Sequence, residues 1–153
     1  MTVKNWGVNE MFDFKFDWKK ELEVGIPEID EQHRELFRIV RDMEQLLITR
    51  CIGVSNQQLI DVVRQLREFV SYHFYEEEKV MNEFDYSLKE AHIASHNKMN
   101  EMVLSIDLPK LGEMPFDELK KIKDGTQDWI FEHMFNADKH MGLEIKEKMK
   151  QRQ

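Results

Sequence analysis

Polar side chains occupy core positions of a helical apolar repeat in the stretch HFYEEEKVM, residues 73–81. Apolar residues recur at spacings of three and four from Leu59 to Phe84, which is the period that places side chains on one face of an α-helix. His73 and Glu77 stand in the same register, one helical turn apart. The repeat therefore predicts a long helix that carries an imidazole and a carboxylate into the interior.

Three further helical stripes show the same feature. Each contains at least one histidine in core register: His33 in residues 33–47, His92 and His96 in residues 88–106, and His133 in residues 119–134. Only six glycines and three prolines interrupt the chain, so the stripes can run as helices rather than strands. Four amphipathic helices joined by short connections favour an antiparallel up-and-down four-helix bundle, and we predict an all-α fold.

Local signals suggest where two of these helices begin. Ser55 with Gln58 has the spacing of a capping box, and Ser87 with Glu90 repeats it. We therefore expect the second and third helices to start just after Ser55 and Ser87.

The two ends of the chain depart from the bundle pattern. The stretch MFDFKFDW, residues 11–18, alternates aromatic and charged residues with a period of two, which predicts an extended arm that packs across the bundle for stability. A short terminal helix is expected around Leu143, Ile145 and Met149. We divide the chain into an N-terminal arm, residues 1–24, and one four-helix bundle domain, residues 25–153.

Charge and composition exclude several classes of partner. The 153 residues include 22 basic and 30 acidic side chains, and the net charge of −8 argues against binding nucleic acid or an anionic membrane. No apolar run is long enough to insert into a membrane, and the N-terminus lacks the apolar core of a secretory signal. The single Cys51 cannot form an internal disulfide. We expect a cytoplasmic, monomeric domain that binds a small ligand.

A carboxylate among buried imidazoles requires a positive partner. One histidine on an apolar face is more often an ordinary core residue than a ligand, but here all of the six histidines except His140 fall in core register. Burying an ionised Glu77 without compensation would cost several kcal/mol, and a metal cation would remove that cost. The flanking Glu76 and Glu78 rotate about 100° away and are expected to be solvated or interhelical charges.

Asp138, in the stretch HMFNAD, is the second candidate carboxylate. It follows His133 by five residues, which on an uninterrupted α-helix would place it about 140° away from that histidine. We expect Asn136 and Ala137 to end the helix, so that Asp138 turns back toward the site. The alternative is an aspartate that only caps the terminal helix. His140 lies outside the register and is expected at the surface.

The number of donors exceeds what one metal ion can use. A structural zinc is closed by four donors, whereas this set offers five imidazoles and two carboxylates. Two ions bridged by both carboxylates would use every donor and, with a bridging oxygen, would leave one ion short of a sixth ligand. Mixed imidazole and carboxylate donors favour iron over manganese, cobalt or zinc. The seven candidate metal ligands are His33, His73, Glu77, His92, His96, His133 and Asp138.

Four motifs that contain these residues resemble those of the hemerythrins, in particular the single-domain bacteriohemerythrins. They are VGIPEIDEQH ending at His33, HFYEEE over 73–78, HIASH over 92–96 and HMFNAD over 133–138. The resemblance extends from Trp18 to the terminal helix. It implies a four-helix bundle around two iron ions with a bridging oxo or hydroxo group, which binds dioxygen reversibly.

The resemblance also implies individual roles. His92, His96 and His133 would hold one iron, His33 and His73 would hold the other, and Glu77 and Asp138 would bridge the two. The family's oxygen pocket matches Leu36, Phe74, Trp129, Ile130 and Met134. Met134 stands where the family often has an aliphatic residue, and its flexible, oxidisable thioether leaves autoxidation rate and ligand access open.

The functional hypothesis is therefore an oxygen carrier, storage or delivery protein rather than an enzyme, with dioxygen as its ligand and an oxygen-consuming enzyme as a candidate partner. The alternatives are a di-iron enzyme that acts on oxygen, peroxide or nitric oxide, and a sensor of oxygen or iron. Carboxylate-rich di-iron enzymes carry Glu-x-x-His elements, and this sequence has none. A zinc peptidase is disfavoured because Ile93 follows His92, where the HExxH motif needs its glutamate.

Overall fold

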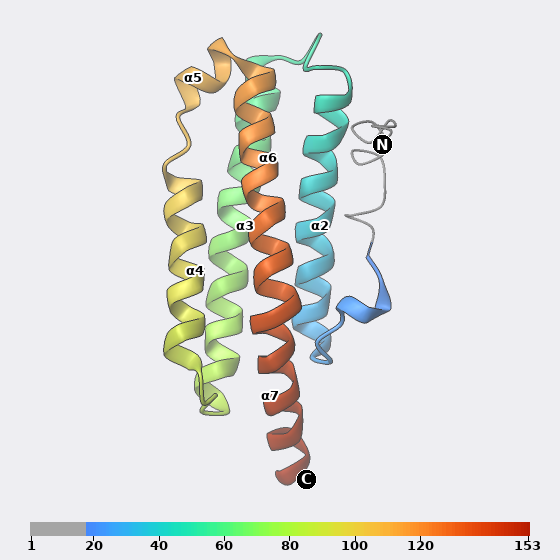
Figure 1. Ribbon diagram of the computed structural model, residues 1–153, viewed down its shortest axis with the longest axis vertical. Coiled ribbons are helices and arrows are strands. Elements are labelled where there is room, and N and C mark those ends of the chain that lie inside the picture. The colour runs from blue at the N-terminus through green and yellow to red at the C-terminus, as the bar shows by residue number, and fades with distance from the viewer. Residues whose placement is uncertain (1–17) are drawn as a thin grey trace, which may run out of the picture.

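Four long antiparallel helices form a bundle in the computed structural model, which describes residues 18–153. They are α2 (Pro27–Ile48), α3 (Asn56–Glu83), α4 (Lys89–Leu104) and α6 (Pro115–Glu132). Consecutive long helices run in opposite directions, and the short α5 (Leu108–Glu113) crosses one end of the bundle between α4 and α6 (Figure 1). The all-α, up-and-down bundle predicted from the apolar stripes is confirmed.

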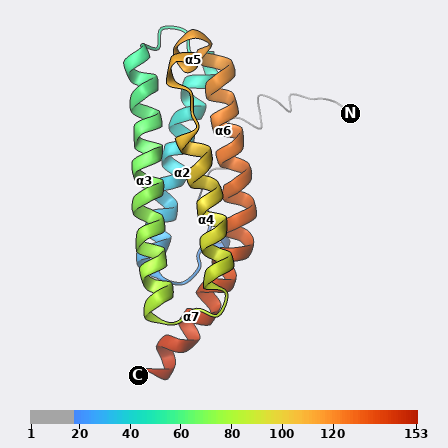
Figure 2. The same ribbon diagram turned by 90° about the vertical axis from the view of Figure 1, so that its left-hand side faces the viewer.

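The C-terminal helix α7 (Lys139–Gln151) continues the direction of α6 and projects beyond the end of the bundle (Figures 1 and 2). A π-helical turn, His133–Asp138, joins the two helices without a loop. The expected terminal helix is therefore present, and it forms the lower end of one long helical rod (Figure 1).

The helices α3 and α4 differ in how their first turns are capped. Ser55 caps α3 as expected: its hydroxyl accepts the Gln58 N–H at 3.1 Å and its own N–H donates to Gln58 Oε1 at 2.8 Å. The capping pair expected for Ser87 is wrong, although α4 does begin two residues after it, at Lys89. The Ser87 N–H donates at 2.8 Å to Glu144 of α7 rather than to Glu90, and α4 begins without a side-chain cap. A distant carboxylate has replaced the local partner.

The apolar stripes of the long helices meet in one main core. Its fully buried members include Leu36, Met43, Leu66, Met99 and Leu119, one or two from each long helix. A second cluster closes the end of the bundle where α7 meets the segment before α2; it comprises Val24, Ile26, Ile29, Met81, Phe84, Tyr86, Met141 and Ile145. Together the two clusters enclose the polar residues from both sides along the bundle axis.

The predicted N-terminal arm falls mostly outside the described residues. Of the stretch MFDFKFDW only Trp18 is described; its ring packs edge-on against Phe37 with centroids 5.5 Å apart, and the Arg34 guanidinium lies 5.2 Å from its centre. Lys20–Leu22 form a short 3-10 turn. Within residues 18–153, no helix is both long and apolar enough to cross a membrane.

Gly142 allows α7 to approach the segment before α2. A Cβ at this position would lie 2.9 Å from Val24 Cβ and well inside van der Waals contact with the Val24 carbonyl oxygen. We predict that Gly142→Ala lowers the free energy of unfolding by about 1–3 kcal/mol, because the Val24 backbone must move. Urea unfolding at a fixed metal state measures this.

Gly125→Ala, also within a helix, is the matched control. Its Cβ would meet only the flexible Met102 Sδ at 3.0 Å, while alanine favours a helix by about 1 kcal/mol. We expect this variant to be neutral or slightly stabilised. Equal stability losses in both variants would contradict the close contact assigned to Gly142.

Candidate metal centre

Seven buried polar side chains meet between the four long helices, toward the end of the bundle where α6 joins α7. His33 lies on α2, His73 and Glu77 on α3, His92 and His96 on α4, and His133 and Asp138 at the two ends of the π-helical turn. Each is at most 3% exposed. The structure thus brings together all seven candidate ligands predicted from the sequence.

Glu77 lies at the centre of this cluster and presents its two oxygens to different histidines. Its Oε1 is 2.7 Å from His92 Nε2 and 2.9 Å from His96 Nε2. Its Oε2 is 3.3 Å from His73 Nε2 and 3.6 Å from His33 Nε2. One carboxylate therefore faces imidazoles from three helices.

Asp138 divides its oxygens in the same way. Its Oδ1 is 2.9 Å from His133 Nε2 and 3.0 Å from His92 Nε2, whereas Oδ2 is 3.1 Å from His33 Nε2. All five histidines accordingly direct Nε2 inward toward one or both acids.

The cluster separates into two sets of donors that share both carboxylates. We call His92, His96 and His133 the three-histidine set and His33 and His73 the two-histidine set. The potential ligand atoms of each set, with those of Glu77 and Asp138, lie within 4.8 Å of one another. Each carboxylate contributes one oxygen to each set, which is the arrangement a bridging ligand requires.

The π-helical turn places Asp138 in the cluster. Hydrogen bonding from residue i to i+5 brings residues five apart onto one face, so Asp138 returns to the face of His133. The expected break at Asn136 and Ala137 is wrong, because the helix absorbs the extra residue and continues. The alternative of a simple cap is also wrong, since the Asp138 side chain makes no capping hydrogen bond to α7.

Three of the imidazoles are also held from outside the cluster through Nδ1. The pairs are His73 with Gln32 Oε1 at 2.7 Å, His96 with Glu78 Oε2 at 2.8 Å, and His133 with Ser95 Oγ at 2.8 Å. Outer partners of this kind fix the tautomer and orientation of a ligating histidine. Glu78 is thus an interhelical charge, one of the two roles expected for it.

Sequence spacing does not identify Gln32 or Ser95. Gln32 is adjacent to His33 in the chain yet contacts His73 on another helix, and Ser95 is adjacent to His96 yet contacts His133. These pairings depend on how the helices face one another, so no periodicity within one helix could reveal them.

Burial and nearby charges shift the pKa values of these groups in opposite directions. Burial lowers the pKa of His33, but contacts with Asp138 and Glu77 outweigh it and raise that pKa to about 9. The same balance raises the pKa of His92 to about 9. Burial prevails at His73, whose pKa falls. Although burial raises the pKa of both carboxyl groups, the surrounding imidazoles hold those pKa values well below their usual range, so Glu77 and Asp138 are ionised at neutral pH.

The chemistry of the donors fits a pair of cations. Protein hydrogen bonds leave several buried atoms of the cluster unsatisfied, among them Glu77 Oε2, His33 Nε2 and both Asp138 oxygens. The Nε2 atoms of His92 and His133 also converge, 3.1 Å apart, on the side of the cluster where Asp138 Oδ1 lies. Converging imidazole nitrogens and carboxylate oxygens are the ligands that iron and related metals accept.

Aromatic side chains pack directly against the cluster. The five predicted pocket residues Leu36, Phe74, Trp129, Ile130 and Met134 are buried in the main core or, for Trp129, packed against it. Phe74 stacks on His96 with ring centroids 3.9 Å apart, and Trp129 stacks on His133 at 4.2 Å. Both rings therefore contact the three-histidine set directly.

Tyr86 covers His92 from the connection between α3 and α4. Its buried ring meets the His92 ring edge-on at 6.0 Å, and its hydroxyl lies 2.7 Å from Nδ1 of His140. Burial and nearby carboxylates, including Glu144, raise the pKa of Tyr86 to about 12. His140 is exposed, as predicted, and has no atom in either donor set.

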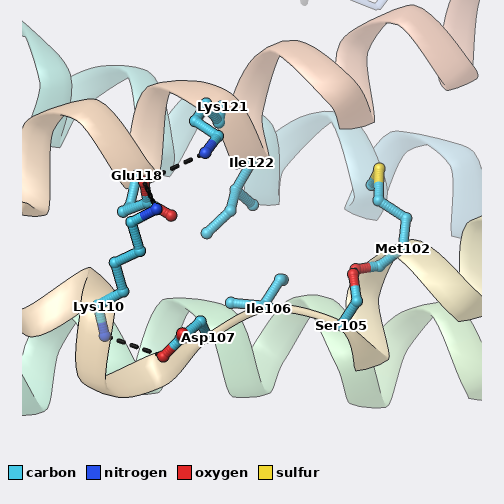
Figure 3. Close-up of a pocket in the computed structure, with 8 residues that line it drawn as sticks. All are labelled: Met102, Ser105, Ile106, Asp107, Lys110, Glu118, Lys121 and Ile122. Carbon is cyan, nitrogen blue, oxygen red and sulfur yellow. Dashed lines mark hydrogen bonds and ion pairs between the residues drawn. The ribbon is translucent and has the colours of Figure 1, made fainter.

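A separate groove of about 390 Å³ lies at the opposite end of the bundle, between the end of α4, α5 and the start of α6. Figure 3 shows Ile106 and Ile122 facing each other across it, with Lys110 and Lys121 turned toward Glu118. The two lysine ammonium groups lie 3.8 Å and 3.3 Å from Glu118 Oε2. The groove contains none of the seven candidate ligands.

Comparison with known proteins identifies the family. Residues 24–142 match the hemerythrin HHE cation binding domain, so the chain belongs to the hemerythrin family. A bacteriohemerythrin of Clostridium acetobutylicum is 28% identical over 124 residues, which cover 81% of this chain and 96% of that protein. A bacteriohemerythrin of Campylobacter jejuni is 30% identical over 124 residues, 80% of this chain and 89% of the relative.

Proposed function

We propose that the chain binds dioxygen reversibly at a carboxylate-bridged, non-haem di-iron centre, as an oxygen carrier, storage or delivery protein. The observation that carries the proposal is the division of five Nε2 atoms between two carboxylates, each of which offers one oxygen to each set. His92, His96 and His133 would hold one iron, and His33 and His73 the other. Glu77 and Asp138 would bridge them.

The unequal sets support binding of a ligand at one side only. The three-histidine set and two shared carboxylates offer five protein donors, whereas the two-histidine set and the same carboxylates offer four. When bound, an iron pair supplies the electrons and the open coordination position that reversible dioxygen binding requires. The protein therefore supplies one donor fewer on the two-histidine side.

The surroundings favour binding over catalysis. Leu36, Ile130 and Met134 are almost fully buried and carry no group that could act as a general acid or base. Such a lining excludes water and suits a small neutral ligand. Five imidazoles with only two carboxylates also differ from the carboxylate-rich di-iron enzymes. Both features support a carrier rather than an enzyme that acts on oxygen, peroxide or nitric oxide.

The first test is the visible spectrum of the reduced, iron-loaded protein. We expect two irons per chain by elemental analysis and a charge-transfer band that appears in air and fades when oxygen is removed. A band that forms once and does not reverse would instead favour an oxygen-activating enzyme.

The second test concerns the bridge. Glu77→Ala removes one of the two carboxylates that both sets share, so we expect it to lose the paired centre and to hold at most one iron per chain. Glu76→Ala is the control, because Glu76 is half-buried and pairs with Lys79 at 3.3 Å away from the cluster. Retention of two irons by the Glu77 variant would refute the bridging role.

A further inference from the structure

We propose that Glu78 makes the two metal positions unequal in affinity, so that the three-histidine position binds its ion more tightly and fills first. This inference rests on the proposed two-metal site and adds an order of filling to it. Glu78 would act as a positioning residue through His96, without contacting either ion.

The geometry places the His96 ring between two carboxylates. Its Nδ1 lies 2.8 Å from Glu78 Oε2, and its Nε2 lies 2.9 Å from Glu77 Oε1. Glu78 comes from α3 and His96 from α4, so the contact spans two helices. The His96 side chain is fully buried, whereas that of Glu78 is 30% exposed, which lets its charge remain partly hydrated.

No other histidine of the cluster has a charged outer partner within residues 18–153. His73 meets the neutral amide of Gln32, and His133 meets the neutral hydroxyl of Ser95. The Nδ1 atoms of His33 and His92 have no hydrogen-bond partner in the described part of the chain. The outer charge is therefore confined to the three-histidine set.

A carboxylate partner does more than orient an imidazole. An ionised carboxylate can only accept hydrogen bonds, so Glu78 holds the proton on His96 Nδ1. The lone pair on Nε2 then points toward the cluster. The negative charge of Glu78 also makes Nε2 a stronger electron-pair donor, as in carboxylate–histidine–metal arrangements. The amide oxygen of Gln32 can fix the His73 tautomer but adds no charge. Loss of such an outer partner typically weakens metal binding about 10–100-fold.

The three consecutive acids of HFYEEE therefore differ in environment. Glu77 lies inside the cluster, Glu78 contacts a histidine from outside, and Glu76 pairs with Lys79. Glu76→Gln and Glu78→Gln remove the same charge two residues apart on one helix. Comparison of these two variants separates an effect on metal affinity that acts through His96 from a general effect of net charge.

The test is a titration of the metal-free protein with Co²⁺ without oxygen, followed by visible absorption and calorimetry. The wild type should bind two ions per chain in two resolved steps. Glu78→Gln should weaken the first step about 10–100-fold and leave the second little changed, whereas Glu76→Gln should alter neither. A His33→Ala/His73→Ala background, which retains only the three-histidine set, should show the same loss on adding Glu78→Gln.

Exchanging the outer partners provides the converse test. Gln32→Glu should tighten the second step, and Gln32→Glu with Glu78→Gln should favour the two-histidine position. Thermal unfolding of each metal-free variant shows whether a change reflects lost folding instead. The inference would be overturned if Glu78→Gln weakened both binding steps equally, or if Glu76→Gln weakened the first step as much as Glu78→Gln does. Either result would leave the binding of two ions per chain unaffected. A wild type that binds fewer than two ions would overturn the two-metal site itself.

Discussion

The structure depends on two ionised acids held in a dry interior by imidazoles from α2, α3, α4 and the π-helical turn after α6. Glu77 and Asp138 are fully buried, and their charges are tolerable only because five Nε2 atoms surround them. The segments that carry the imidazoles must therefore meet at the correct height and rotation. The antiparallel bundle therefore has a fixed register at this level, which ordinary apolar packing alone would specify less strictly.

The polar cluster and the two apolar clusters make different contributions to the fold. Leucine, methionine and aromatic side chains on both sides of the cluster exclude water, while Gln32, Glu78 and Ser95 supply hydrogen bonds from the periphery. Exclusion of water strengthens every electrostatic contact within. Outer hydrogen bonds limit the rotation of the rings, so the same residues that stabilise the bundle also define the donor geometry.

Much of this could be predicted from the sequence because a helix is periodic. The spacing of His73 with Glu77, and of His92 with His96, determines that each pair shares a face, and His33 and His133 fall in the core register of their own stripes. The Ser55 cap was predictable because both of its partners are local. The hydrogen-bond partner of Ser87 was not, because Glu144 is 57 residues away. The outer partners also depend on tertiary contacts that no single stripe encodes.

The π-helical turn has a mechanical consequence. Because α6 and α7 form one uninterrupted rod, Asp138 sits partway along a lever whose free end carries the C-terminus outside the bundle (Figure 1). Just beyond that point Met141 and Ile145 of the rod pack in one apolar cluster with Tyr86 and the segment before α2. The position of α7 is therefore coupled through continuous helical backbone to Asp138, a residue that faces both donor sets.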